Sequence, residues 1–191
     1  MLYLLIYNMY IIVNKGETQM TFHEKKTIVT SITGLIITFS YLFYAIFKYN
    51  QGLPESLTLK FWAMTILTFI GIGIVGIIIA MILFNIFYSI SLAIKMRLEN
   101  KDITDKEIEQ KIAQIVKTDT VEDEMAKLIE LKSMRIGFSF AGIGFVIALF
   151  SIVLNYSPII MINILFLSFS LGSALEGLTQ LYYYRKGIRH A

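Results

Sequence analysis

The sequence contains no cysteine, only two prolines and only two histidines. Without cysteine the chain has no disulfide framework and no thiolate nucleophile. His23 and His190 lie at opposite ends of the sequence, so the usual ligand sets for zinc or haem are missing and we expect no cofactor. The apolar stretches also lack a Ser/His/Asp set, paired carboxylates and a usable phosphate-binding loop, which indicates that the protein is not an enzyme.

Charged residues are scarce as well, and the deficit is concentrated in particular stretches. They make up 16% of the chain, against about 25% in an ordinary soluble domain, while 56% of the residues are hydrophobic. No Asp, Glu, Lys or Arg occurs in residues 27–47, 61–94 or 136–175. A transmembrane helix needs roughly 20 mostly apolar residues, and Asn155-Tyr156-Ser157-Pro158 interrupts the third stretch near its middle. The sequence therefore predicts an all-α integral membrane protein with four transmembrane helices.

The boundaries of the predicted segments follow from the charges and the turn signals. The second uncharged stretch would make about 50 Å of helix, which is more than a bilayer requires, so its end is expected to leave the membrane and continue as a helix. The predicted segments are an N-terminal cytoplasmic or interfacial segment (1–26), the first span (27–47), the second span with its cytoplasmic extension (61–94), an amphipathic helical cytoplasmic insertion (95–135), the third span (136–154), the fourth span (159–181) and a basic tail (182–191).

Lysine and arginine gather on one side of these spans. They precede the first span, border the 95–135 segment and follow the fourth span, whereas the two remaining loops contain only Lys48 and Lys60. Because cytoplasmic loops carry the excess of positive charge, both termini are expected in the cytoplasm. The protein is then a multi-pass component of the cell's inner (plasma) membrane, with the lipid bilayer as a partner and no nucleic-acid partner.

The first residues of the chain leave two interpretations open. Residues 1–13 are apolar but too short to cross a bilayer as a helix. They also lack the basic region and the cleavage site of a secretory signal. They are either an interfacial segment or an extension upstream of a translation start at Met20.

The segment between the second and third spans has the pattern of two amphipathic helices. Thr104 and Glu107 have the spacing of a capping box, and a second helix is expected to start near Thr118 and to continue into the third span. The apolar side chains at helical spacing are Ile108, Ile112, Ile115, Val116, Met125, Leu128, Ile129 and Met134. These stripes are expected to pack as a helical hairpin or to lie on the inner leaflet. The alternative is that residues 100–130 dock a partner protein or a second copy of the chain.

Glu176 is the one ionisable residue that falls inside a predicted span. Such charges are costly in lipid and are usually paired, so the first expectation is an ion pair with Arg135, Lys132 or Lys95. Gln180 lies one helical turn further on and is expected to share the polar contact. Glu176, Gln180 and Arg135 are therefore the candidate intramembrane polar site, and a proton- or cation-coupled role for Glu176 is the alternative.

Small residues recur in the spans at spacings typical of close helix packing. Gly71, Gly73 and Gly76 match a dinucleotide-binding pattern, but that pattern works only where a strand turns into a helix. Small residues let membrane helices approach closely, so packing seams are predicted at these glycines and at the pairs Gly137 with Ala141 and Ser168 with Gly172.

The remaining polar residues of the spans are expected to form hydrogen bonds between helices. They are Asn85, Asn163, Ser31, Thr33, Thr38 and Ser40. Along the sequence they are too scattered to outline a conduction path.

Three short charged motifs resemble an uncharacterised family of small bacterial four-span membrane proteins, the DUF2178-like group. Residues 22–27 (Phe-His-Glu-Lys-Lys-Thr) are similar to that group's F-x-E-K-K-x start, and residues 121–132 to its acidic D-E-R-D-x-x-I-E-x-K motif before the third span. Residues 184–187 (Tyr-Arg-Lys-Gly) also fit. The sequence departs at Met125, where the motif has arginine. The resemblance covers residues 20–187 and implies the four-span plan, but no activity.

Two functions are compatible with these features. The leading prediction is a non-enzymatic regulatory, accessory or immunity-type role, in which the cytoplasmic helical segment contacts a partner or a second copy. It follows from the patterned, charged 95–135 segment beside spans that lack catalytic groups. The alternative is a small oligomeric transporter or channel that uses Glu176.

Overall fold

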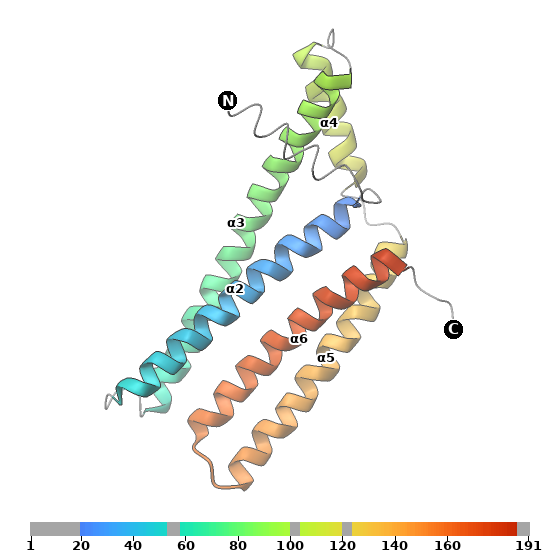
Figure 1. The fold of residues 1–191 in the computed structure, drawn as a ribbon. Coiled ribbons are helices and arrows are strands. Elements are labelled where there is room, and N and C mark those ends of the chain that lie inside the picture. The colour runs from blue at the N-terminus through green and yellow to red at the C-terminus, as the bar shows by residue number, and fades with distance from the viewer. Residues whose placement is uncertain (1–19, 53–57, 100–103, 120–123, 187–191) are drawn as a thin grey trace.

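The computed structural model describes residues 20–52, 58–99, 104–119 and 124–186, and within these ranges every regular element is a helix (Figure 1). The helices are α2 (Phe22–Gln51), α3 (Leu59–Glu99), α4 (Asp105–Asp119), α5 (Glu124–Val153) and α6 (Pro158–Lys186). All of them except α4 are long and apolar enough to cross a membrane. The predictions made for residues 1–19, around residues 120–123 and for the end of the tail lie outside the described residues.

The outward faces of the four long helices are apolar. Phe43 is 77% exposed and Val153 is 73% exposed, and many other large apolar side chains are similarly uncovered. Monomeric soluble proteins rarely expose large contiguous apolar patches, whereas lipid covers such faces at no cost. The fold therefore suggests a membrane protein.

Two helices continue across predicted boundaries between a membrane span and the 95–135 segment. α3 continues without a break for 41 residues, about 60 Å at 1.5 Å per residue, so the second apolar stretch and its extension are one helix. α5 starts at Glu124 and runs unbroken to Val153. The second amphipathic segment and the third apolar stretch are therefore also one helix, as predicted.

Local signals define the ends of α2 and the turn between α5 and α6. At the start of α2, Thr21 and Glu24 form a capping box with bonds of 2.8 and 3.2 Å, a feature not predicted from the sequence. Gly52 ends the helix in a left-handed conformation (φ 59°), which glycine adopts readily. Asn155 takes a similar φ of 62° in the turn, and Pro158 opens α6 with its favourable fixed φ.

The helices pack in a definite order. α5 and α6 form an antiparallel hairpin with the most extensive contact, α2 lies against both α6 and α3, and α4 packs mainly against α3 (Figure 1). The start of α2, the end of α3, the start of α5 and the end of α6 lie toward one end of the bundle. We call it the α4 end, because α4 is there.

The α5–α6 seam confirms the prediction for Gly137, Ala141, Ser168 and Gly172. A methyl group placed on Gly172 would stand 2.6 Å from the carbonyl oxygen of Gly137, and one placed on Gly137 would stand 2.9 Å from the carbonyl oxygen of Gly172. Ala141 is 5% exposed, and Ser168 lies directly against Gly144. The two backbones therefore touch, which only the smallest residues allow.

The glycines of α3 do not form a comparable seam. Among the described residues nothing lies within 4 Å of a methyl group placed on Gly71, so the predicted packing seam does not form there between these residues. Gly73 and Gly76 face the Ile37 side chain of α2 at ordinary contact distances of 4.0 and 3.4 Å. A branched side chain, and not backbone, fills the space, so α2 and α3 stay further apart than α5 and α6.

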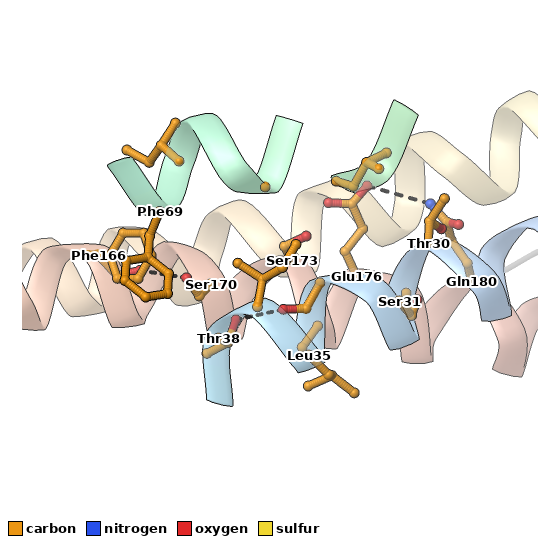
Figure 2. A pocket seen from close by; sticks show the side chains of 17 residues that line it. Thr30, Ser31, Leu35, Thr38, Phe69, Phe166, Ser170, Ser173, Glu176 and Gln180 are labelled. Carbon is orange, nitrogen blue, oxygen red and sulfur yellow. Dashed lines mark hydrogen bonds between the residues drawn. The ribbon is translucent and has the colours of Figure 1, made fainter. Parts of the chain in front are cut away.

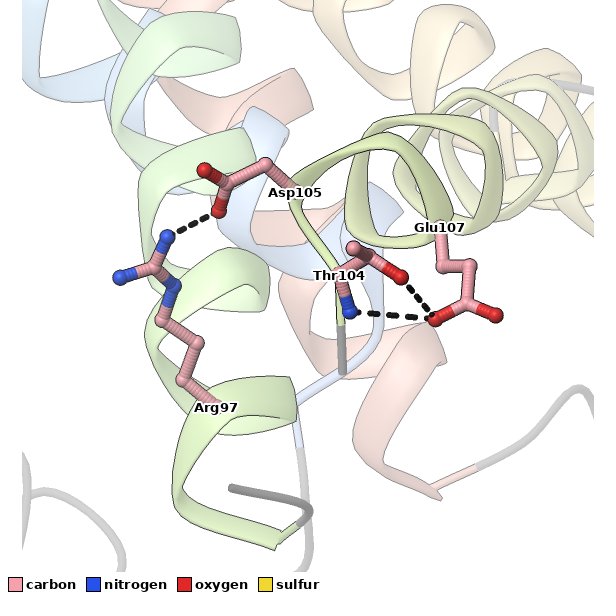
Figure 3. A network of polar contacts seen from close by, with 4 residues as sticks. All are labelled: Arg97, Thr104, Asp105 and Glu107. Atoms are coloured by element: carbon pink, nitrogen blue, oxygen red, sulfur yellow. Dashed lines mark hydrogen bonds and ion pairs between the residues drawn. The ribbon is translucent and has the colours of Figure 1, made fainter. Parts of the chain in front are cut away.

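α4 is attached to α3 through polar contacts at both of its ends. Arg97 and Asp105 form an ion pair next to the start of α4 (Figure 3), and the Tyr88 hydroxyl donates to Asp119 at 2.5 Å. Ile108, which begins the apolar stripe, is 6% exposed. The stripe is therefore used partly against α3, whereas a hairpin within the insertion was one expectation.

The predicted capping box at Thr104 is half formed. The Thr104 amide donates to the Glu107 carboxylate at 3.1 Å, but the Thr104 hydroxyl donates to the same carboxylate at 2.7 Å where a capping box would have it accept from the backbone (Figure 3). These bonds from the Thr104 hydroxyl and amide stabilise the ionised form and hold the pKa of Glu107 below its usual value of 4.5.

Candidate functional site

Glu176 lies on α6, about 15 Å along the helix from the end at Lys186. The Gln180 side-chain amide, one turn further on, donates a long hydrogen bond of 3.5 Å to the Glu176 carboxylate. The Gln180 carbonyl oxygen accepts from the Thr27 hydroxyl of α2 at 3.1 Å. The structure therefore brings Glu176 and Gln180 together, as predicted, and adds Thr27.

The expected ion pair of Glu176 is not formed between described residues. The ion pair found among them joins Arg97 to Asp105, and no Lys or Arg side chain of the described part lies within 4.0 Å of the Glu176 carboxylate. Arg135 is on the wrong face of α5. Gly137 faces Glu176, and two residues turn a helix by about 200°, so the Arg135 side chain points away and is exposed.

Glu176 lines a cavity of about 280 Å³ between α2, α3 and α6 (Figure 2). Glu176 and Gln180 lie at one end of it, and Phe69 and Phe166 at the other. The lining residues are Thr30, Ser31, Gly34, Leu35, Ile37 and Thr38 from α2, Phe69, Ile70, Gly73 and Ile77 from α3, and Phe166, Ser170, Ser173, Ala174, Glu176, Gly177 and Gln180 from α6.

Three hydroxyl groups of this cavity are oriented as acceptors. Thr30, Thr38 and Ser170 each donate their proton to a backbone carbonyl of their own helix, at 2.9–3.1 Å. A hydroxyl that donates into its helix leaves its oxygen lone pairs free to accept. Since the described lining contains no Lys, Arg or His, the cavity offers many acceptors and one carboxylate, but few donors.

The meeting of α2 and α6 beside Glu176 was not predicted. Ser31 lies directly against Gly177, where any larger residue would collide with it. Further along the same two helices the Tyr41 hydroxyl donates to the Asn163 side chain at 2.5 Å. Asn163 is thus interhelical, as expected, whereas Asn85, Thr33, Thr38 and Ser40 donate to carbonyls of their own helices.

Of the six polar residues named from the sequence, Ser31 and Thr38 line the cavity. Residues 27, 31, 34 and 38 of α2 are three or four positions apart, and residues 166, 170, 173, 177 and 180 of α6 follow the same spacing. Such spacing places all members on one face of a helix. This pattern, read together on the two helices, is the signal that would have located the site.

The described residues hold no group of three His, Cys, Asp or Glu side chains that could bind a metal ion. Comparison with protein-family models, with curated proteins and with solved structures finds no match for this chain. The resemblance to the DUF2178-like group therefore stays a prediction, and the function has to be argued from the cavity.

Proposed function

We propose that this protein binds a small organic cation at Glu176, inside the bilayer, and moves it across the membrane. The single observation that supports the proposal most is the acceptor-rich cavity, whose carboxylate has no cationic partner among the described residues. This is the transporter alternative predicted from the sequence. It accounts for a charge that would otherwise be costly in lipid.

The chemistry of the lining fits a cation with an apolar body. An ammonium group at the Glu176 end gains a charge-assisted hydrogen bond, of a kind about twice as strong as a neutral one. Nearby hydroxyl oxygens accept hydrogen bonds from its remaining N–H groups. Phe69 and Phe166 line the other end, where an aromatic or alkyl group can stack. A volume of about 280 Å³ is at the lower limit for ligand pockets, roughly 300 Å³, so the solute is small.

We also propose the orientation of the protein in the inner membrane. Basic residues mark helix ends at the α4 end of the bundle: Lys25 and Lys26 on α2, Lys95 and Arg97 on α3, Lys127 and Lys132 on α5, and Arg185 and Lys186 on α6. The excess of positive charge favours the cytoplasm for this end. The α5–α6 turn then faces the opposite side, and both chain termini are cytoplasmic.

The proposal is tested by binding of 2-phenylethylammonium to the purified protein in nanodiscs, measured by calorimetry. Glu176→Gln keeps the size of the side chain and removes its charge, so affinity should fall roughly 10- to 100-fold, the value of a hydrogen bond to a charged group. Neutral 2-phenylethanol should bind both proteins equally weakly. Glu109→Gln, on the exposed surface of α4, is the matched control and should leave binding unchanged.

Equal affinity of the Glu176→Gln variant and the unmodified protein for 2-phenylethylammonium would refute the proposal, as would no binding by either. A preference for 2-phenylethanol would do the same, because it would show that the charge is irrelevant.

The accessory role predicted for residues 100–130 stays a prediction. The apolar stripe of α4 is used partly against α3, since Ile108 is buried there. The surface that α4 leaves open is mainly polar. A partner of this segment would therefore recognise charges, and the described residues give no further indication of its nature.

A further inference from the structure

A second cavity, of about 190 Å³, adjoins the first at the α4 end of the bundle, since Thr30 and Gln180 line both. Three helices contribute to it: the start of α2, the start of α5 and the end of α6. Its lining residues are His23, Lys26, Thr27, Thr30, Ala126, Glu130, Gln180 and Tyr184. Most of these side chains are polar, so water and ions can occupy this space. We call it the vestibule.

Gln180 stands between the vestibule and the Glu176 cavity. Gln180 and Thr30 line both spaces. The Gln180 side chain is held across the boundary by two bonds, from the Thr27 hydroxyl at 3.1 Å and to the Glu176 carboxylate at 3.5 Å. Gln180, held by these hydrogen bonds, therefore lies at the boundary that the two cavities share.

We propose that the vestibule is the route by which the cation reaches Glu176, and that the Thr27–Gln180 hydrogen bond is the gate on that route. The inference rests on the proposed function. Glu130 lines the vestibule and supplies a second carboxylate on this route. A cation on this route therefore meets a carboxylate before it reaches Glu176, although Lys26 lines the same vestibule.

The gate is weak enough to open thermally. Neutral hydrogen bonds contribute about 1 kcal/mol each, and side-chain rotamers exchange on short timescales when packing allows. Gln180 is half-buried, so its side chain has space on the vestibule side. Gln180 is a positioning residue here: it holds Glu176 and closes the passage.

The test uses the natural absence of cysteine from the chain. Ala174→Cys places one thiol in the Glu176 cavity. The membrane-impermeant cation 2-(trimethylammonium)ethyl methanethiosulfonate is applied to sealed vesicles of known orientation, from the α4 face or from the face of the α5–α6 turn. Modification should be faster from the α4 face.

Removal of the gate should then accelerate modification from the α4 face only. In the Ala174→Cys background, Thr27→Val deletes the hydroxyl at nearly constant shape and should raise the rate roughly 5-fold, the kinetic equivalent of one hydrogen bond. Thr27→Ser keeps the hydroxyl and should leave the rate unchanged. Gln180→Ala is the second variant, and it should accelerate modification at least as much.

Equal rates from the two faces, or faster modification from the turn face, would overturn the route. Equal rates for Thr27→Val and Thr27→Ser, with Gln180→Ala unchanged, would overturn the gate. These failures are distinct from failure of the proposed function. Suppose that modification is faster from the α4 face and is accelerated by Thr27→Val, but that Glu176→Gln binds 2-phenylethylammonium as tightly as the unmodified protein. Cation binding would then be refuted, and the proposed passage would stand.

Discussion

Tyr41→Ala is expected to lower the free energy of unfolding by about 3 kcal/mol, the lower end of the range for removing a large buried aromatic side chain. Tyr41 is completely buried. Its ring packs against Phe69 of α3 at 5.2 Å and Phe166 of α6 at 4.4 Å between centroids. Lipid reduces the hydrophobic part of this loss, but the lost packing contacts and the cavity remain. The measurement is the midpoint of unfolding in a titration with SDS.

Two companion variants separate the ring from its hydroxyl. Tyr41→Phe removes the bond to Asn163 at 2.5 Å and should cost only about 1 kcal/mol. Phe43→Ala, on the same helix but 77% exposed, should have almost no effect. A loss for Phe43→Ala as large as that for Tyr41→Ala would mean that α2 does not pack against α3 and α6 through the face described above.

Gly172→Ala is expected to separate α5 from α6 and to lower the free energy of unfolding by about 2 kcal/mol, a typical cost of overpacking. The added methyl group would stand 2.6 Å from the Gly137 carbonyl oxygen. That neighbour is backbone and cannot rotate away, so a helix has to shift. Thermal unfolding in detergent and cross-linking across the α5–α6 seam both report the shift.

Gly142→Ala provides a control of opposite sign. Gly142 is on α5, but in the part of the chain that the structure describes nothing lies within 4 Å of a methyl group placed there. Alanine is the better helix former by about 0.8–1.0 kcal/mol, so this variant should be neutral or slightly more stable. If both variants were equally harmless, the close contact of the two backbones would be refuted.

The long elements could be predicted from the sequence because one physical constraint governs them. Lipid excludes charge from long stretches of chain, so residues 27–47, 61–94 and 136–175 already outline α2, α3 and the α5–α6 hairpin. The α5–α6 seam could also be predicted, because a very short turn forces these helices to be neighbours and their small residues then face each other.

The contacts of α2 could not be predicted in the same way. Ser31 meets Gly177 and Tyr41 meets Asn163 across more than a hundred residues of chain, and such pairs depend on how each helix is rotated about its axis. Rotation is a property of packing, which the composition of one helix does not determine. For the same reason Arg135 was expected beside Glu176, although it is on the other face of α5.

The glycines of α3 show the limit of motif spacing. Their pattern is as regular as that of α5 and α6. Yet a methyl group placed on Gly71 would meet no described residue within 4 Å, and Gly73 lines the cavity beside Glu176. A small residue permits close approach without causing it. What lies opposite such a glycine depends on the facing residue of the neighbouring helix, which for Gly73 and Gly76 is Ile37.

The central claim is that α2, α3, α5 and α6 cross a bilayer with α4 on one face and the α5–α6 turn on the other. Because the chain has no cysteine, single cysteines at Glu109 in α4 and at Tyr156 in the turn can be labelled with an impermeant maleimide in intact cells. The account predicts that Tyr156→Cys is labelled in intact cells and Glu109→Cys only after lysis. Labelling of both positions from the same face, or release of the protein from vesicles by carbonate, would contradict it.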